Sequence, residues 1–324
     1  MSQMFQDASA FNADISDWDL RALSDAWSMF KKAKAFTVDI TGWSTPALVP
    51  SKTYDLFTDA DAWLDLYSTP GGSSMGPFDR WSRHKFTSKD ELQEMLDVCL
   101  DQKPPSGIGC KLICGDRLFC GEIGDWDVSQ ITDLDGLFKN RADFNGDVSK
   151  WNTISVTSMN SVFSGAAAFT GDVSRWNTAK VTNMRDMFNS ATLFAGDLGS
   201  WDTGNVVDMG WMFHKADAFI GGNIGNWDTG KVDVMWKMFG DNKVFNADIS
   251  QWNTASMGTV QEMFDGASAF NVDITGWNCD LVSTHAHRYR ANMFRNADAW
   301  LSAYSRLDGK DSRDGPPTLW KANQ

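Results

Sequence analysis

The chain lacks most features that would indicate membrane insertion, nucleic-acid binding or catalysis. Its 324 residues contain no apolar run that approaches the roughly 18 to 20 residues needed to cross a bilayer. Lys and Arg number 29 against 42 Asp and Glu, and the net charge of -13 argues against nucleic acid or an anionic membrane surface as a partner. There is no glycine-rich phosphate loop, no Gly-x-Ser-x-Gly and no His-Glu-x-x-His, and the four histidines do not recur with any period. We therefore expect a protein that is not an enzyme, holds no cofactor and does not itself span a membrane.

Tyrosine is also scarce, with four residues, whereas the chain has 16 Trp and 21 Phe, and these aromatics repeat. Tryptophan recurs every 25 or 26 residues, at Trp126, Trp151, Trp176, Trp201, Trp227, Trp252 and Trp277. Two phenylalanine columns run in phase with it, at Phe138, Phe163, Phe188, Phe213, Phe239 and Phe264, and at Phe144, Phe169, Phe194, Phe219, Phe245 and Phe270. A unit of this length buries its apolar face only by stacking on copies of itself. The tryptophan column is therefore expected to form the structural core.

We predict the fold class to be an α/β repeat solenoid, a leucine-rich-repeat-like stack of ~25-residue units with short parallel strands and short helices. Within one unit, Val173 to Trp176 is long enough only for a one-pleat strand. Val181, Met184 and the Met187–Phe188 pair have a 3.6-residue spacing that predicts a helix of about two turns. The methionines of this pattern are expected to fill the core.

The repeats fall into two arrays. Residues 1–68 are the C-terminal part of a first array with its cap, and residues 121–305 are a second array of about seven units plus a cap. Residues 69–86 resemble a linker, residues 87–120 a helical N-cap of the second array, and residues 306–324 an extended or mobile tail. In the N-cap, Ser88-x-x-Glu91 forms a capping box before an amphipathic helix.

Four of the five cysteines lie in this N-cap, at Cys99, Cys110, Cys114 and Cys120. Their spacing matches a zinc site poorly, and no histidine is nearby in the sequence. We expect disulfides among them, with free thiols and a metal site as the alternatives. Disulfides would favour an oxidising compartment.

The repeat unit carries a resemblance to a known family. The pattern Val-Thr-x-Met-x-x-Met-Phe-x-x-Ala-x-x-Phe-Asn-x-Asp-Ile-Ser-x-Trp-Asn-Thr resembles the repeat of the BspA-like leucine-rich-repeat surface proteins. It is most similar to the subfamily of mycoplasma lipoproteins, which is also abundant in marine protists, and it covers nearly all of residues 4–68 and 119–305. The resemblance implies surface display and protein contact. It favours an extracellular or cell-surface location, with an organelle lumen or the periphery of a membrane complex as the alternative.

Three polar columns accompany the aromatic ones. The aspartate column either binds calcium or accepts backbone N–H groups at its own turn, and we favour the second interpretation; it comprises Asp14, Asp39, Asp147, Asp172, Asp197, Asp248 and Asp273. Asn and Asp after each Trp predict a buried ladder that bonds the backbone of the adjacent layer. The next column is threonine, which we expect to cap turns; an ice-binding file is the minor alternative.

Candidate partner contacts are the aromatic residues outside the core columns. Trp27, Trp211 and Trp236 fall two or three residues before a repeat phenylalanine, and they either pack between neighbouring units or contact a partner. Phe5 and Phe11 belong to the first unit, which we expect further repeats or another subunit to cover. We therefore predict a non-enzymatic protein-interaction module for surface recognition or adhesion. An accessory scaffold subunit of a large multiprotein assembly, such as an organellar membrane complex, is the alternative.

Overall fold

The computed structural model describes residues 1–40, 43–45, 48, 55–64, 85–102, 111–114, 118–284, 289–309 and 313–323. Of residues 98–99, 101–102, 111–122, 125 and 284 it describes the backbone only. The chain divides into two compact units, one of residues 1–86, 95–99 and 109–127, the other of residues 87–94, 100–108 and 128–324. Residues 69–84 of the predicted linker lie outside the described residues. No helix in the described part of the chain is long and apolar enough to cross a membrane.

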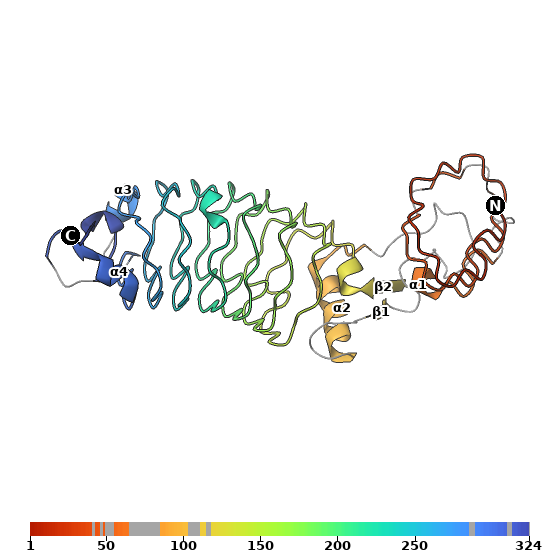
Figure 1. The fold of residues 1–324 in the computed structure, drawn as a ribbon, viewed down its shortest axis with the longest axis horizontal. Coiled ribbons are helices and arrows are strands. Elements are labelled where there is room, and N and C mark those ends of the chain that lie inside the picture. The colour runs from red at the N-terminus through yellow and green to blue at the C-terminus, as the bar shows by residue number, and fades with distance from the viewer. Residues whose placement is uncertain are drawn as a thin grey trace. The chain divides into compact units, whose positions relative to one another are not determined.

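In the second unit each repeat forms one coil that stacks on the next, as the green to blue part of Figure 1 shows. Along one side of the coil that contains Phe188, the N–H groups of four alternate residues from Met184 to Ser190 donate to carbonyls of the following coil, at 2.8 to 2.9 Å. Isolated parallel bridges connect one residue of each coil, at Asp133, Ser158, Asn183, Asp208, Val234 and Thr259. Hydrogen bonds between residues about one repeat apart therefore hold the stack together.

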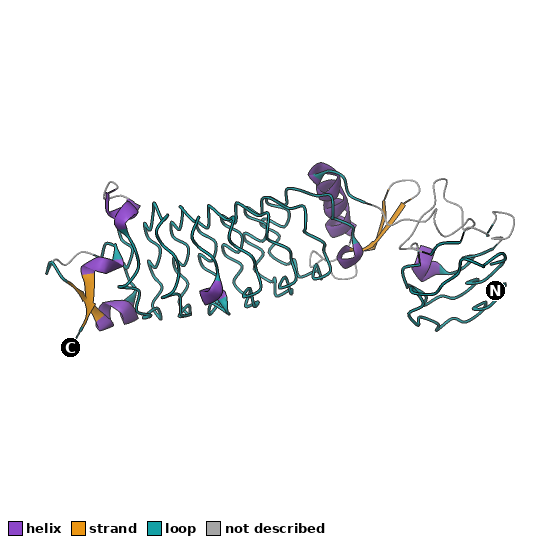
Figure 2. Cartoon of the chain, turned by 90° about the horizontal axis from the view of Figure 1, so that it is seen from above, coloured by secondary structure: helices purple, strands orange, loops and turns teal. Residues whose placement is uncertain are grey.

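The predicted short helix in each unit is wrong. Residues 185–190 form successive turns, and Met187, Asn189 and Ala191 each donate to the carbonyl three residues earlier. Within these turns, Asp186 and Ser190 adopt left-handed φ values of 57° and 59°. An α-helix needs every N–H to bond the carbonyl four residues back, whereas here alternate N–H groups are used between coils. Figure 2 accordingly shows the coils as loops, and in residues 128–279 the one helical segment is the 3-10 helix η4, Ile224–Asn226.

The strand predicted at Val173 to Trp176 is wrong as well, because this segment is a turn in which the N–H of Trp176 donates to the carbonyl of Val173 at 3.1 Å. The parallel bridges lie about eight residues further along, at the column of Asn183. The 3.6-residue spacing thus marks which side chains face inward without producing helical hydrogen bonds.

The aromatic columns form the core of the second unit. Its repeat tryptophans are 3 to 4% exposed, as is Trp126 of the first unit, and the rings of Trp151 and Trp176 stack with their centroids 6.2 Å apart. The indole N–H of Trp176 donates to the carbonyl of Val148 at 3.0 Å. Phe188 stacks on Phe213 of the next coil at 5.8 Å. Each ring therefore contacts its counterpart in the neighbouring coil, and the polar atom of each indole is satisfied.

The first unit repeats this construction on a smaller scale. Phe5 donates its N–H to Met29 at 2.8 Å, and Phe30 donates to Leu56 at 2.9 Å. Helix α1, Asp61–Leu64, follows the last of these coils and places Trp63 in the core, stacked on Phe57 at 3.8 Å. The antiparallel strands β1, Lys111–Cys114, and β2, Leu118–Glu122, belong to the same unit and lead into the 3-10 helix η3, Ile123–Asp125.

Helix α2, Lys89–Gln102, begins where the capping box was predicted. The hydroxyl of Ser88 accepts the N–H of Glu91 at 3.2 Å, and the carboxylate of Glu91 accepts the N–H of Thr87 at 3.1 Å. At the start of the helix, Lys89 pairs with Asp133 at 3.2 Å. This ion pair places the first turn of α2 beside the first coil of the second array.

The C-terminal tail packs on the last coil, which corrects the expectation of an extended or mobile segment. Two helices precede the tail, α3, Asp280–Thr284, and α4, Asp298–Ala303. Strand β3, Tyr304–Arg306, follows α4 directly. The 3-10 helix η6, Pro317–Leu319, leads into strand β4, Trp320–Ala322, which pairs antiparallel with β3. Trp320 is 5% exposed and lies edge-on to Phe294 at 5.4 Å. The carbonyl of Arg313 accepts the N–H of Phe294 at 2.9 Å. This cap was not predictable from the repeat pattern, because the tail lies outside the repeat.

Candidate partner-binding surface

The aspartate column is held by its own turns. In six of its members the carboxylate accepts the N–H of the residue two positions on, at 2.9 to 3.0 Å; they are Asp14, Asp147, Asp172, Asp197, Asp248 and Asp273. These bonds favour the charged carboxylate, and the N–H of Ser174 is the main reason that the pKa of Asp172 is lowered. The turn interpretation of this column thus has direct geometric support. Among the described residues, no group of three or more His, Cys, Asp or Glu side chains is arranged to hold a metal ion.

The buried Asn/Asp ladder is wrong, and threonine takes its role. Asn177 is exposed, and its side chain accepts the N–H of Ala179 at 3.1 Å within its own turn. Thr178 is 2% exposed and donates its hydroxyl to the carbonyl of Asp202 in the next coil at 2.9 Å. The same bond recurs from Thr153, Thr203, Thr229 and Thr254. Because these threonines are buried, they cannot present a file of hydroxyls to ice.

One side of the second array varies from coil to coil. Around each buried phenylalanine, the residues three and two positions before it and one and two positions after it form what we call the variable face. The coil of Phe163 has Asn160, Ser161, Ser164 and Gly165 at these positions. The following three coils have larger aromatic or charged side chains at some of these positions and keep Gly, Ser or Asn at the others. The larger residues are Arg185, Asp186, Trp211, His214, Lys215, Trp236, Lys237 and Asp241. Since the aromatic core columns of these coils are unchanged, packing of the aromatic core does not require this variation.

Trp211 and Trp236 lie at the centre of this face. Both are half-buried, and their rings meet edge to face with centroids 5.6 Å apart. Lys237 places its ammonium 5.0 Å from the Trp211 ring, and Arg185 its guanidinium 5.8 Å from the Trp236 ring. Both separations are within the range of cation–π attraction. The buried indole N–H of Trp236 has no hydrogen-bond partner among the described residues.

The backbone at Trp211 is unusual for so large a residue. Its φ is 61°, in the left-handed region, and that of Lys237 at the same position of the next coil is 53°. The equivalent positions in earlier coils are Gly136, Ser161 and Asp186, all with positive φ. Glycine adopts this conformation without strain, and Asn and Asp tolerate it better than other residues, whereas a bulky residue is an outlier there. The repeat imposes this conformation, but it does not require a tryptophan at the position.

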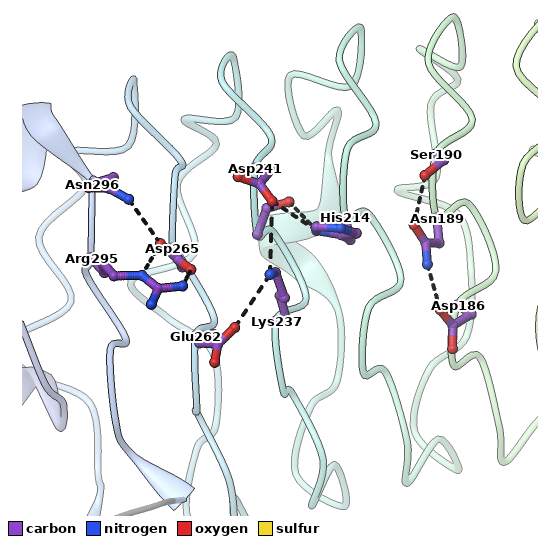
Figure 3. A network of polar contacts seen from close by, with 11 residues as sticks. Asp186, Asn189, Ser190, His214, Lys237, Asp241, Glu262, Asp265, Arg295 and Asn296 are labelled. Atoms are coloured by element: carbon purple, nitrogen blue, oxygen red, sulfur yellow. Dashed lines mark hydrogen bonds and ion pairs between the residues drawn. The ribbon is translucent and has the colours of Figure 1, made fainter.

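Charged side chains continue the cluster across the next coils, as Figure 3 shows. Lys237 lies 3.3 Å from Glu262 and 3.9 Å from Asp241, so it connects neighbouring coils as well as covering Trp211. Further along, Asp265 is almost fully buried and forms a bidentate pair with Arg295. Positive and negative side chains alternate over this part of the face, so neither sign is in excess there.

His214 packs beneath this cluster and is 4% exposed. Its Nδ1 lies 2.7 Å from the carbonyl oxygen of Gly240, and its ring meets Trp211 edge-on at 4.5 Å. Burial is the main reason that the pKa of His214 is lowered. Because the four histidines do not recur with the repeat, their positions in the sequence did not indicate a role for His214.

Three exposed apolar side chains lie on the same three coils. We call Leu193, Ile220 and Val244 the apolar ridge; they are 56, 66 and 38% exposed. In most other coils of the array the position of Ile220 is polar, and Asn145 there accepts the N–H of Thr170 at 2.9 Å. The extra residue of the 26-residue repeat follows directly after Ile220, where Gly221 and Gly222 adopt φ values of 112° and 44°. The ridge is therefore a local departure from the repeat, next to an insertion.

The other predicted contacts lie in the first unit. Trp27 is 43% exposed, at the position that Trp236 occupies in the second array. Phe5 and Phe11 are half-buried; they stack on each other at 4.0 Å and on Phe30 and Phe36 of the next coil. These two phenylalanines thus belong to the core layer of their coil.

The predicted disulfides stay a prediction. Cys110 and the side chains of Cys99, Cys114 and Cys120 lie outside what the structure describes, as do His84, His285 and His287. The fifth cysteine, Cys279, is free and buried, and burial raises the pKa of its thiol to about 12. At neutral pH this thiol is therefore uncharged and poorly reactive.

Comparison with known proteins places the chain in a repeat family. A family model described as "Mycoplasma protein of unknown function, DUF285" matches residues 1–67, 114–222 and 196–307, which together make up most of the sequence. The three matches fall on the two arrays of aromatic repeats. No curated protein and no solved structure matches the chain. With stacked coils of this repeat over most of its length, the chain belongs to the DUF285 family of mycoplasma-type repeat proteins.

Proposed function

We propose that the chain is a non-enzymatic solenoid that binds a protein partner through the second array, as a surface or secreted recognition protein. The proposed footprint joins the variable face around Trp211 and Trp236 to the apolar ridge. Tryptophan and arginine are the residues most enriched at the energetic centres of protein interfaces. Trp211, Trp236 and Arg185 lie together on one side of three consecutive coils.

The observation that carries the proposal is the left-handed backbone of Trp211. If the indole served only the fold, the glycine that an earlier coil has at this position, Gly136, would hold this conformation at lower cost. The ridge adds a second argument, since three large apolar side chains are exposed on the same coils although the repeat supplies polar residues at one of these positions.

The test compares variants that the repeat itself suggests. Trp211→Ser and Trp236→Asn introduce the residues of the Phe163 coil, Ser161 and Asn160, and are combined in one variant. Ile154→Ala is the matched control, because it removes an exposed apolar side chain elsewhere on the array and introduces the residue found one repeat later. Each protein is isolated in native form from its source and its complexes are weighed by native mass spectrometry.

We expect the wild-type chain and the control to retain a partner, and the double variant to lose it while remaining folded by circular dichroism. Retention of the partner by the double variant would rule out this footprint. A partner that co-purifies through many fractions at fixed stoichiometry would favour the scaffold-subunit alternative over reversible surface recognition.

A further inference from the structure

We infer that His214 is a positioning residue for the Trp211 part of this surface, and that protonation of its ring releases Trp211 and weakens partner binding in mildly acidic solution. This inference rests on the proposed function. It concerns a side chain that touches the surface from below and does not itself need to contact the partner.

The hydrogen bond of His214 fixes which ring nitrogen carries the proton. A carbonyl oxygen only accepts, so Nδ1 must be the donor to Gly240, and in the neutral ring Nε2 carries no hydrogen. The same carbonyl also accepts the N–H of Lys215 at 3.0 Å. The imidazole is thereby held against the next coil, with its ring against the edge of Trp211.

Gly240 makes this packing possible. A Cβ at position 240 would lie 2.3 Å from Cγ of Lys237 and 3.2 Å from Nδ1 of His214. Without a side chain there, the Lys237 stem crosses the turn and its ammonium reaches both the Trp211 ring and Glu262. The imidazole, the lysine stem and the indole therefore form one packed group, in which movement of one member displaces the others.

The charges around the ring oppose its protonation. Lys237 on the following coil and Lys215 on its own coil both disfavour a positive imidazole, and Asp241, whose carboxylate is 3.8 Å from Nδ1, favours it. From the preceding coil, Ser190 donates its N–H to the carbonyl of His214. Burial adds the largest opposing effect.

A protonated ring would thus be a third positive charge beside two lysines, in a place with little water. Rotation toward solvent restores its hydration, and this motion breaks the bond to Gly240 and removes the edge contact with Trp211. The surface then loses the contact between the imidazole of His214 and the ring of Trp211. Since one proton is involved, partner affinity changes by at most about tenfold per pH unit below the midpoint.

The first experiment needs only the full chain. Histidine ring protons and tryptophan indole N–H signals are followed by NMR from pH 7.5 to 5. We expect His214 to titrate with a midpoint below its ordinary pKa of 6.5. The indole of Trp211 should shift with the same midpoint, whereas that of Trp176, buried in the core, should not. Titration of His214 without any response from Trp211 would overturn the inference.

The variant His214→Asn, which introduces the residue of the preceding coil, Asn189, supplies the second experiment. It removes the ring and its contact with Trp211, so it should flatten the Trp211 profile and leave partner binding equally weakened at pH 7.5 and at pH 5. If the variant still shows the wild-type profile, another group controls Trp211. Failure of the proposed function is seen separately, as partner binding that survives Trp211→Ser at pH 7.5.

Discussion

Truncation of a tryptophan should cost more stability at Trp176 than at Trp211. Trp176 is 3% exposed, stacks on Trp151 and donates to a buried carbonyl. Replacing it with alanine leaves a cavity that stacked layers cannot close, at a cost of about 3 to 5 kcal/mol. The carbonyl of Val148 also loses its donor, which adds about 1 kcal/mol.

For Trp211→Ser the losses come from surface contacts and are smaller. The edge contacts with His214 and Trp236 are worth about 0.5 to 1.5 kcal/mol each, and the Lys237 contact about 0.5 to 1 kcal/mol. Serine keeps a Cβ, so the left-handed backbone, which Ser161 also adopts, costs it about as much as it costs tryptophan. The total loss should therefore be about 1.5 to 4 kcal/mol.

The two variants are compared by urea unfolding, followed through near-ultraviolet circular dichroism and, because repeat arrays need not unfold in two states, through hydrogen exchange of the affected coils. We expect Trp176→Ala to lose about 2 kcal/mol more than Trp211→Ser, or roughly thirtyfold in the unfolding equilibrium. Equal losses for both variants would refute the argument, since Trp211 would then be a core residue. A loss below about 1 kcal/mol for Trp176→Ala would refute the assignment of the core column.

Further predictions concern the cap, the threonine ladder and the turns. Trp320→Ala should destabilise the last coil by about 3 kcal/mol, seen as faster hydrogen exchange around Phe294; unchanged exchange would mean that the tail does not cover the coil. Thr178→Val should cost about 1 to 2 kcal/mol in urea unfolding, whereas Thr178→Ser, which keeps the hydroxyl, should cost less; equal costs would deny the bond to the next coil. The lowered pKa of Asp172 means that its stabilising effect is complete above about pH 3.8 and is lost as pH falls through the folded-state pKa. Asp172→Asn should therefore reduce the slope of acid destabilisation, and an unchanged slope would show that this turn does not depend on the charge.

The regular spacing of apolar residues correctly predicted which side chains form the core columns. The same spacing wrongly predicted a helix in each repeat. Val181, Met184 and Phe188 face inward at helical spacing, but their backbone is a series of turns that bonds the next coil. Spacing reports which side chains are buried and does not report where the N–H groups go. The exchange of roles between Asn177 and Thr178 has a similar cause: adjacent polar residues look alike in sequence, and only the turn geometry decides which one faces inward.

The candidate surface was partly predictable. Trp211 and Trp236 stood out because they fall outside the core columns. His214 and Lys237 did not, because their importance depends on contacts across coils about 25 residues apart. Comparing equivalent positions of successive repeats is the signal that would have found them, since several small residues of one coil are replaced by large or charged residues in the next three. The ridge was missed for the same reason.

The hydrogen bonds between coils give each row of the stack a direction. In the row that runs through Phe188, N–H groups point to the following coil and carbonyls to the preceding one, so this row has a donor end at its last coil. A second row runs the other way, since Val207 donates its N–H to the preceding coil at Thr182. In the second unit the donor end is occupied: the carbonyl of Arg313 accepts from Phe294, and the carboxylate of Asp314 accepts the N–H of Asn292 at 2.8 Å. The tail thus closes an edge that would otherwise template the addition of another coil, and so limits the stack's growth into fibres.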